Sequence, residues 1–144
     1  MTLRCLIVDD SPDFLDAARR LLQQEGIDVA GVASTGDEAV RLANELRPDV
    51  TLLDIDLGSE AGFDVARRLA DTAGRNAGVV ILISTHDGEE FVDAIEASPV
   101  VGFIPKSALS ADAIRQLLGR SATDAEGGGR PGVRWGTGSG EPGE

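Results

Sequence analysis

The chain has 144 residues, which is enough for one domain with a full hydrophobic core and too few for two substantial ones. Asp and Glu number 25 against 13 Lys and Arg, so the net charge of −12 argues against a nucleic acid partner and suits a cation-binding site. The single cysteine, Cys5, is expected in the core, and no apolar run is long enough to span a membrane, so we expect a cytoplasmic protein.

The chain begins with a strand pattern, a helix pattern and a second strand pattern. Residues 3–8 form an apolar run typical of a buried strand. Ser11 is predicted to be the N-cap of the next helix, with Pro12 at its first position and Gly26 as its stop. A second strand is predicted over residues 28–33.

The alternation of strand and helix patterns then continues to about residue 120. Thr35 and Glu38 form a capping-box pattern for a second helix, which ends before Pro48. Further strands are predicted over residues 50–53, 79–84 and 100–104, and further helices from about Gly62, from Asp87 or Gly88, and from about Ser110.

Five strand and helix repeats indicate an α/β domain over residues 1–121, with parallel strands, right-handed crossovers and helices on both faces of one sheet. From residue 122 the chain is rich in Gly and has no periodic apolar face, so residues 122–144 are expected to form a flexible tail. Trp135 in that tail is interpreted as incidental, with a docking anchor for a partner as the alternative.

Polar residues gather where the predicted strands end. They are Asp9 and Asp10 after the first strand, Asp54 and Asp56 after the third, Ser84 at the end of the fourth, and Lys106 after the fifth. Because parallel strands end at one edge of a sheet, we expect these side chains to meet there, although each alone could be an ordinary turn, cap or surface residue. Converging carboxylates need a counterion, and all-oxygen ligands favour Mg²⁺ or Mn²⁺ over zinc. With Lys106 and Ser84 facing a phosphoryl group, this arrangement indicates phosphorylation of an aspartate.

Four segments together resemble the receiver domain of bacterial two-component response regulators, over residues 3–119. They are "LIVDDSPDFLDAARRLL", "VTLLDIDLGSEAGFDVARRL", "VVILIST" and "GFIPKSALS". The resemblance implies a flavodoxin-like fold, in which a five-stranded parallel sheet of order 2-1-3-4-5 carries five helices on its two faces.

The resemblance also implies roles for the polar residues. Asp54 matches the aspartate that receives a phosphoryl group from a histidine kinase or a histidine phosphotransfer protein, and Lys106 matches the lysine that pairs with the phosphate. Asp54 and Asp10 match direct Mg²⁺ ligands, Asp9 a neighbour that acts through water, and Asp56 a position whose backbone carbonyl completes the metal shell.

Two further matches concern the output of such a domain. Ser84 matches a switch hydroxyl, and Phe103 matches an aromatic residue that turns inward on phosphorylation, with plain core packing as the alternative for Phe103. The resemblance implies a changed binding face made by the fourth helix, the fifth strand and the fifth helix, which contacts a downstream protein or a second copy of the chain.

Some positions depart from the commonest receiver pattern. Gly58 stands where many receivers have proline, and Ser107 rather than proline follows Lys106. Asp56 adds a carboxylate beside the predicted acceptor, and His86, the only histidine, lies at the rim of the site. We expect Asp56 and His86 to tune the lifetime of the phosphoryl group, with an ordinary surface histidine as the alternative for His86.

Two alternatives stay open. In a haloacid-dehalogenase-like phosphohydrolase, Asp54 and Asp56 would be nucleophile and acid, although that family has its motif on the first strand. A degenerate receiver would bind partners without phosphorylation. Residues 102–118 resemble receivers that precede a helix-turn-helix DNA-binding domain, but we expect a stand-alone signalling domain rather than an enzyme, with a lost output domain as the alternative.

Overall fold

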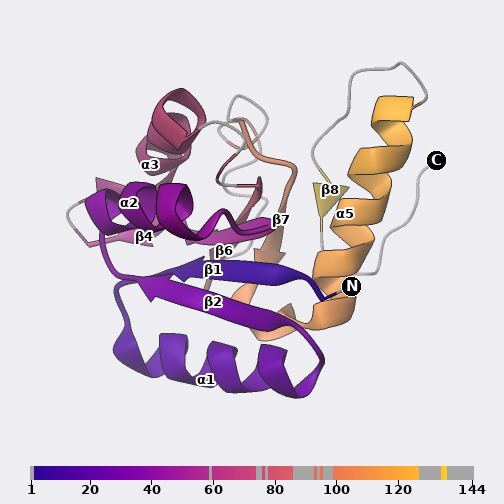
Figure 1. Ribbon diagram of the computed structural model, residues 1–144, viewed down its shortest axis with the longest axis horizontal. Coiled ribbons are helices and arrows are strands. Elements are labelled where there is room, and N and C mark those ends of the chain that lie inside the picture. The colour runs from indigo at the N-terminus through magenta and orange to yellow at the C-terminus, as the bar shows by residue number, and fades with distance from the viewer. Residues whose placement is uncertain are drawn as a thin grey trace.

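A parallel sheet forms the centre of the computed structural model (Figure 1). The structure describes residues 2–58, 60–73, 76, 78–85, 93, 95, 99–126 and 134–135. The five long strands lie in the order β2-β1-β3-β6-β7, which is the order predicted for them. They are β1 (Arg4–Val8), β2 (Asp28–Ala33), β3 (Val50–Asp54), β6 (Val79–Ser84) and β7 (Gly102–Pro105).

Helices cover both faces of this sheet (Figure 1). One face packs against α1 (Pro12–Gln24) and α5 (Ala111–Glu126), and the other against α2 (Gly36–Leu46) and α3 (Gly62–Arg68). These are the four α-helices that the described residues contain, so the prediction of five is not met there. The predicted fourth helix lies mostly outside the described residues.

The third helix also changes character at its end. After α3 the chain continues as a π-helical turn, η1 (Leu69–Ala73). In this turn the Thr72 hydroxyl donates a hydrogen bond of 2.5 Å to the Arg68 carbonyl oxygen. A side-chain hydrogen bond of this kind competes with the regular backbone hydrogen bonds of an α-helix. The helix pattern from Gly62 is therefore confirmed, but not as one uniform α-helix.

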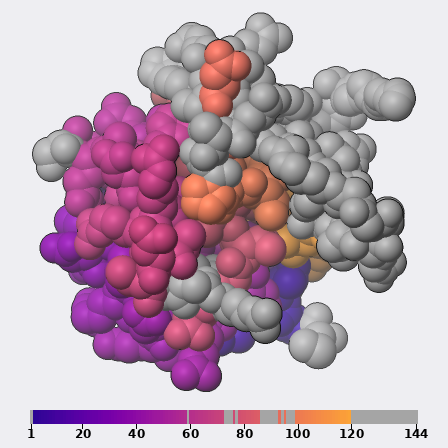
Figure 2. All heavy atoms as spheres, turned by 90° about the horizontal axis from the view of Figure 1, so that it is seen from above, coloured from indigo at the N-terminus to yellow at the C-terminus, as the bar shows by residue number. Residues whose placement is uncertain are grey.

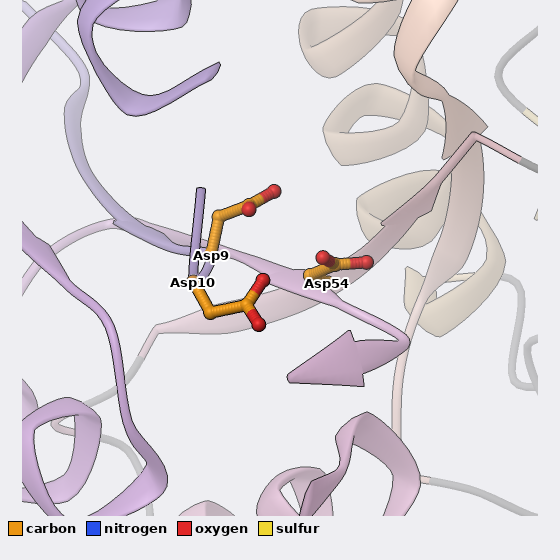
Figure 3. A group of neighbouring side chains, drawn as sticks. All are labelled: Asp9, Asp10 and Asp54. Atoms are coloured by element: carbon orange, nitrogen blue, oxygen red, sulfur yellow. The ribbon is translucent and has the colours of Figure 1, made fainter. Parts of the chain in front are cut away.

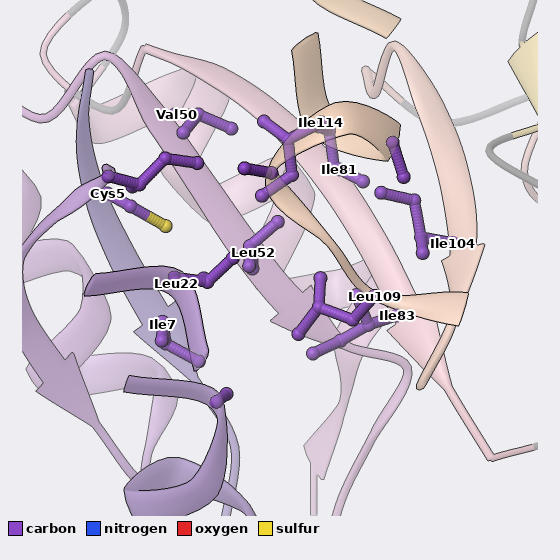
Figure 4. Close-up of a cluster of buried hydrophobic side chains, with 14 of the residues drawn as sticks. Cys5, Ile7, Leu22, Val50, Leu52, Ile81, Ile83, Ile104, Leu109 and Ile114 are labelled. Atoms are coloured by element: carbon purple, nitrogen blue, oxygen red, sulfur yellow. The ribbon is translucent and has the colours of Figure 1, made fainter. Parts of the chain in front are cut away.

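Alternate residues of β1 and β6 enter opposite cores. In β1, Cys5 and Ile7 face the cluster under α1 and α5 (Figure 4), whereas Leu6 and Val8 face the cluster under α2 and α3. A strand that is buried on both faces reads as a continuous apolar run, which is why the runs predicted the strands well. Cys5 is fully buried, so its prediction as a core residue is confirmed, and burial raises the pKa of its thiol to about 12.

The predicted helix starts have their capping groups. Ser11 Oγ accepts a hydrogen bond of 3.3 Å from the backbone N–H of Phe14, and Pro12 stands at the first position of α1. At α2, Thr35 Oγ1 accepts a hydrogen bond of 3.1 Å from the backbone N–H of Glu38. The Glu38 carboxylate accepts a hydrogen bond of 2.9 Å from the backbone N–H of Ser34. In a regular capping box this bond would come from the N–H of Thr35, so the second bond of the predicted box is shifted by one residue.

A small hairpin precedes α3 and was not predicted. Its strands β4 (Asp56–Leu57) and β5 (Glu60–Ala61) pair antiparallel. Glu60 Oε1 accepts a hydrogen bond of 2.7 Å from the backbone N–H of Gly36, and Glu60 Oε2 lies 3.5 Å from Arg68 Nη1. These contacts tie the hairpin to the first turn of α2 and to the end of α3, two helices that pack against each other. In Figure 2, atoms from these two parts of the chain lie on the same side of the molecule.

The C-terminal part has structure beyond the predicted domain boundary. The helix α5 runs past residue 121 to Glu126, and a two-residue strand, β8 (Arg134–Trp135), pairs in parallel with β7 at the edge of the sheet. The division into a domain and a flexible tail stays a prediction. Within the part of the chain that the structure describes, no helix has the length and apolarity needed to cross a bilayer.

Candidate functional site

Three aspartates meet at the carboxyl edge of the sheet. Asp9 and Asp10 follow β1, and Asp54 ends the neighbouring strand β3. One carboxylate oxygen from each residue lies within 4.8 Å of the other two, and Figure 3 shows the three side chains converging. Asp9 and Asp54 are buried, whereas Asp10 is exposed to solvent. The predicted acidic cluster is therefore present, with one side open.

Lys106 supplies the positive charge of this cluster. It stands directly after β7, at the start of a short 3₁₀ turn (Lys106–Ala108). Its Nζ lies 2.6 Å from Asp9 Oδ2 and 3.3 Å from Asp54 Oδ2. Burial alone would lower the pKa of Lys106, but the contact with Asp9 and the charges of both aspartates outweigh it and raise the pKa. Lys106 is therefore an ammonium at neutral pH.

Asp54 has a strongly perturbed carboxyl group. Its pKa is raised to about 6, chiefly by burial and in smaller part by the charge of Asp9. The hydrogen bond from the backbone N–H of Asp56 and the contact with Lys106 act in the opposite direction. The ionised form is thus costly in the protein alone, and a cation beside it would offset that cost.

Asp9 uses its two oxygens differently. Oδ1 accepts a hydrogen bond of 2.8 Å from the backbone N–H of Ser11. Oδ2 is buried and accepts no well-aligned hydrogen bond from any described residue, so its contact with Lys106 is an ion pair. This oxygen retains lone pairs for a further partner. One carboxylate oxygen from each of Asp9, Asp10 and Asp54 contributes to an all-oxygen donor set that fits Mg²⁺ or Mn²⁺.

The hairpin after β3 closes one side of the site. The backbone N–H of Asp56 donates a hydrogen bond of 3.2 Å to Asp54 Oδ1, while the exposed carboxylate of Asp56 accepts one from the N–H of Gly58. Gly58 has a φ of +73°, which proline cannot adopt, and this explains its departure from the receiver pattern. A Cβ on Gly58 would lie 3.0 Å from Asp10 Oδ2, so the hairpin approaches the open side of the cluster.

Ser84 lies on β6, the strand next to β3, and Phe103 lies on β7, the strand beyond it. Ser84 ends β6, is buried, and pairs in register with Pro105, the residue before Lys106. Phe103 is fully buried in β7 and belongs to the cluster under α2 and α3. Ser84 therefore lies on the same edge as the acidic cluster. The switch roles of Ser84 and Phe103 stay predictions, and His86 lies outside the described residues.

One residue near the site was not predicted to belong to it. The ring centroid of Phe14 lies 4.4 Å from Lys106 Nζ. The sequence places Phe14 on the apolar face of α1, where a core role is the ordinary expectation. No local signal identifies a contact with a lysine 92 positions later, because the contact depends on how α1 meets the turn after β7.

Comparisons with known proteins identify the family of this chain. The family model of the response regulator receiver domain matches residues 5–118. A protein-glutamate methylesterase/protein-glutamine glutaminase of Alkalilimnicola ehrlichii is 37% identical over 110 residues, which are 74% of this chain and 27% of that protein. Protein PilH of Pseudomonas aeruginosa is 38% identical over 86 residues, which are 60% of this chain and 70% of PilH.

A solved structure gives the same result. The signal receiver domain of a modulated diguanylate cyclase from Desulfovibrio desulfuricans G20 has a TM-score of 0.70 at 32% identity, covering 88% of this chain and 98% of that one. The chain spans only 27 to 34% of the length of three methylesterase relatives, so the activity in their names is not carried over to it. The fold is flavodoxin-like, and the chain belongs to the response regulator receiver family of two-component systems.

Proposed function

We propose that this protein is a phosphorylation-activated response regulator whose acceptor is Asp54. The phosphoryl group comes from a histidine kinase or a histidine phosphotransfer protein in the cytoplasm. The observation that carries the proposal is the position of Asp54 at the end of β3, with its carboxylate 3.3 Å from Lys106 Nζ and beside Asp9 and Asp10. Family membership supports the same chemistry, since receiver domains are phosphorylated by histidine kinases.

In the transfer step, an oxygen of Asp54 attacks the phosphorus atom of a phosphohistidine. The phosphorus–nitrogen bond breaks, and the histidine nitrogen leaves with the electron pair. Lys106 holds its ammonium beside Asp54, where it offsets the charge on the equatorial oxygens. Because the pKa of Asp54 is about 6, this carboxyl group is ionised in most of the molecules at neutral pH and can attack the phosphorus atom.

The residues that would hold the metal ion come from two loops. Asp10, Asp54 and the backbone carbonyl of Asp56 are proposed as direct ligands, and Asp9 as a ligand through water. Bound there, Mg²⁺ or Mn²⁺ would neutralise negative charge on the phosphoryl oxygens. The hydrogen bond from the Asp56 N–H to Asp54 Oδ1 holds the two ligand-bearing residues together. Asp56 therefore contributes mainly through its backbone.

The output is proposed to be a changed protein-binding face. A phosphoryl group on Asp54 draws the Ser84 hydroxyl inward. The space that the hydroxyl leaves lets the ring of Phe103, which is already buried, repack. The face that responds contains β7 and α5 and contacts a downstream protein or a second copy of the chain. Ser84 and Pro105 lie in register, which gives the acceptor site a direct route to β7.

Asp56 and His86 are proposed to set the lifetime of the phosphoryl group. The carboxylate of Asp56 is exposed at the rim of the site, where a hydrolytic water would approach. Decay of the phosphorylated protein measured in Asp56→Asn and in His86→Ala tests the idea. Unchanged decay rates in both variants would contradict it.

The central experiment is incubation with a small acyl phosphate and Mg²⁺, followed by intact-mass measurement. We expect addition of one phosphoryl group to the wild type and none to Asp54→Asn, because an amide lacks the negatively charged carboxylate oxygen that attacks phosphorus. A chelator added before the donor should also prevent labelling. Asp13→Asn, on the exposed first turn of α1, is the matched control and should be labelled like the wild type.

The same samples decide between the alternatives. Steady release of phosphate from an added phosphomonoester, with loss in Asp56→Asn, would favour a phosphohydrolase that uses Asp54 and Asp56. Absence of labelling in a folded wild type that binds Mg²⁺ would favour a receiver that works without phosphorylation. Either outcome would contradict the proposed function.

A further inference from the structure

Among the described residues, three groups lie close to the ammonium of Lys106. Two are the carboxylates of Asp9 and Asp54, at 2.6 Å and 3.3 Å from Nζ. The third is the half-buried ring of Phe14, whose centroid lies 4.4 Å from Nζ. A cation within about 6 Å of a ring centroid is attracted to the negative face of the ring. The ring is therefore a third group that attracts the ammonium, beside the two carboxylates.

The ring is placed by the same aspartate that pairs with the lysine. Asp9 Oδ1 accepts a hydrogen bond from the backbone N–H of Ser11, and Ser11 Oγ accepts one from the backbone N–H of Phe14. Pro12 presets the backbone for the first turn of α1 between them. The start of α1 and the ammonium are thus both anchored on Asp9, one on each of its oxygens.

A lysine side chain needs such support if it is to act on a transferring phosphoryl group. It has four rotatable carbon–carbon bonds, and a free ammonium gains both entropy and hydration by turning toward water. Electrostatic stabilisation of a transition state depends on charges that are already in place. Removal of the ring face would let the ammonium leave the edge of the sheet more often.

We infer that Phe14 is a positioning residue for phosphoryl transfer, and that the negative face of its ring holds the Lys106 ammonium at the acceptor site. The inference rests on the proposed function, because it assigns a supporting role in the reaction of Asp54. It differs from plain core packing in one respect. A core role depends on the shape of the side chain, whereas this role depends on the electrons of the ring.

The experiment weakens or removes the negative charge on the ring face while the shape of the side chain stays nearly the same. Phe14 is replaced site-specifically by 4-fluoro-, 3,5-difluoro- and 3,4,5-trifluorophenylalanine and by cyclohexylalanine, and the second-order rate of labelling by a small acyl phosphate is measured at saturating Mg²⁺. Successive fluorination weakens the negative ring face, and cyclohexylalanine removes it. We expect a graded decrease that reaches about three- to tenfold with cyclohexylalanine.

Two further variants separate positioning from packing. Phe14→Tyr retains an aromatic face and should be labelled within about twofold of the wild-type rate. Leu15→Ala removes packing from the neighbouring residue of α1, which is partly buried against the same core, and should retain the wild-type rate despite lower stability. The Mg²⁺ affinity, measured by calorimetry, should be unchanged in the cyclohexylalanine protein.

Each outcome bears on a different claim. Wild-type labelling with a flat response to fluorination and to cyclohexylalanine would overturn the role of the ring face. An equal loss of rate in Leu15→Ala would assign the effect to loosened packing and would also overturn it. A folded, Mg²⁺-binding wild type that takes no label would overturn the proposed function itself, and the inference with it.

Discussion

Asp54→Asn should stabilise the protein in the absence of a divalent cation. Burial and the charge of Asp9 raise the pKa of Asp54 from 3.8 to about 6, which means that the ionised carboxyl group is less favourable in the folded than in the unfolded protein. At about 1.4 kcal/mol for a tenfold change in acidity, the ionised form lowers the free energy of unfolding by about 3 kcal/mol. Asn retains an oxygen that can accept the bond from the Asp56 N–H but places an amide N–H₂ toward Lys106. We therefore expect a gain of about 1 to 3 kcal/mol at pH 7.5.

The sign of the pH dependence follows from the same shift. Between about pH 4 and pH 6 the folded protein holds a proton on Asp54 that the unfolded chain has released, so wild-type stability falls as pH rises through this range. Above about pH 6 both states are ionised and the full cost is present. The advantage of Asp54→Asn should therefore be small near pH 4 and largest at neutral pH.

The assay is urea unfolding of both proteins at several pH values in a chelator, repeated in Mg²⁺. A ligand at a hundred times its dissociation constant stabilises the protein that binds it by about 2.7 kcal/mol. Mg²⁺ should thus raise the stability of the wild type more than that of Asp54→Asn and narrow the difference between them. A variant that is less stable than the wild type at pH 7.5 without Mg²⁺, by an amount independent of pH, would refute the reasoning.

Two other substitutions test the loops that hold the site. Gly58→Ala forces a residue with a side chain into a φ of +73° and brings a Cβ within 3.0 Å of Asp10 Oδ2, so we expect a loss of about 1 kcal/mol in urea unfolding and a severalfold weaker Mg²⁺ affinity in calorimetry. An unchanged affinity would separate Gly58 from the metal site. Ser11→Ala removes the N-cap hydrogen bond from the Phe14 N–H and should lower the free energy of unfolding in urea by about 1 kcal/mol. Ser11→Asp can still accept this bond and should retain most of the wild-type stability. Equal losses in both variants would contradict a capping role.

The sequence predicted the elements whose signals are local or repeated. The strand runs were recognisable because both faces of β1, β3 and β6 are buried, so nearly every residue in them is apolar. The start of α1 was recognisable because Ser11 and Pro12 satisfy the free N–H groups of a first turn from within that turn. Parallel alternation then brought Asp9, Asp10, Asp54 and Lys106 to one edge without further information.

The remaining features depend on contacts between distant parts of the chain. The strands β4 and β5 have two residues each, which is too short for any periodicity. Glu60 reaches the backbone of Gly36 across 24 positions, and the ring of Phe14 reaches Lys106 across 92. The strand β8 lies in a Gly-rich stretch with no strand pattern of its own. Such contacts follow from the packed arrangement of elements and not from the propensity of any one segment.

The two adjacent aspartates after β1 illustrate what the structure adds to the motif. Asp9 is fully buried, with Oδ1 on the start of α1 and Oδ2 beside Lys106, whereas Asp10 is exposed and faces the hairpin at Gly58. A substitution at Asp9 therefore disturbs a helix start, an ion pair and a proposed metal ligand together. A substitution at Asp10 disturbs the open side of the donor set alone. Weaker Mg²⁺ binding in an Asp10 variant would therefore directly support a role of that side chain as a metal ligand. In an Asp9 variant the same result would also follow from a displaced α1 and a released Lys106.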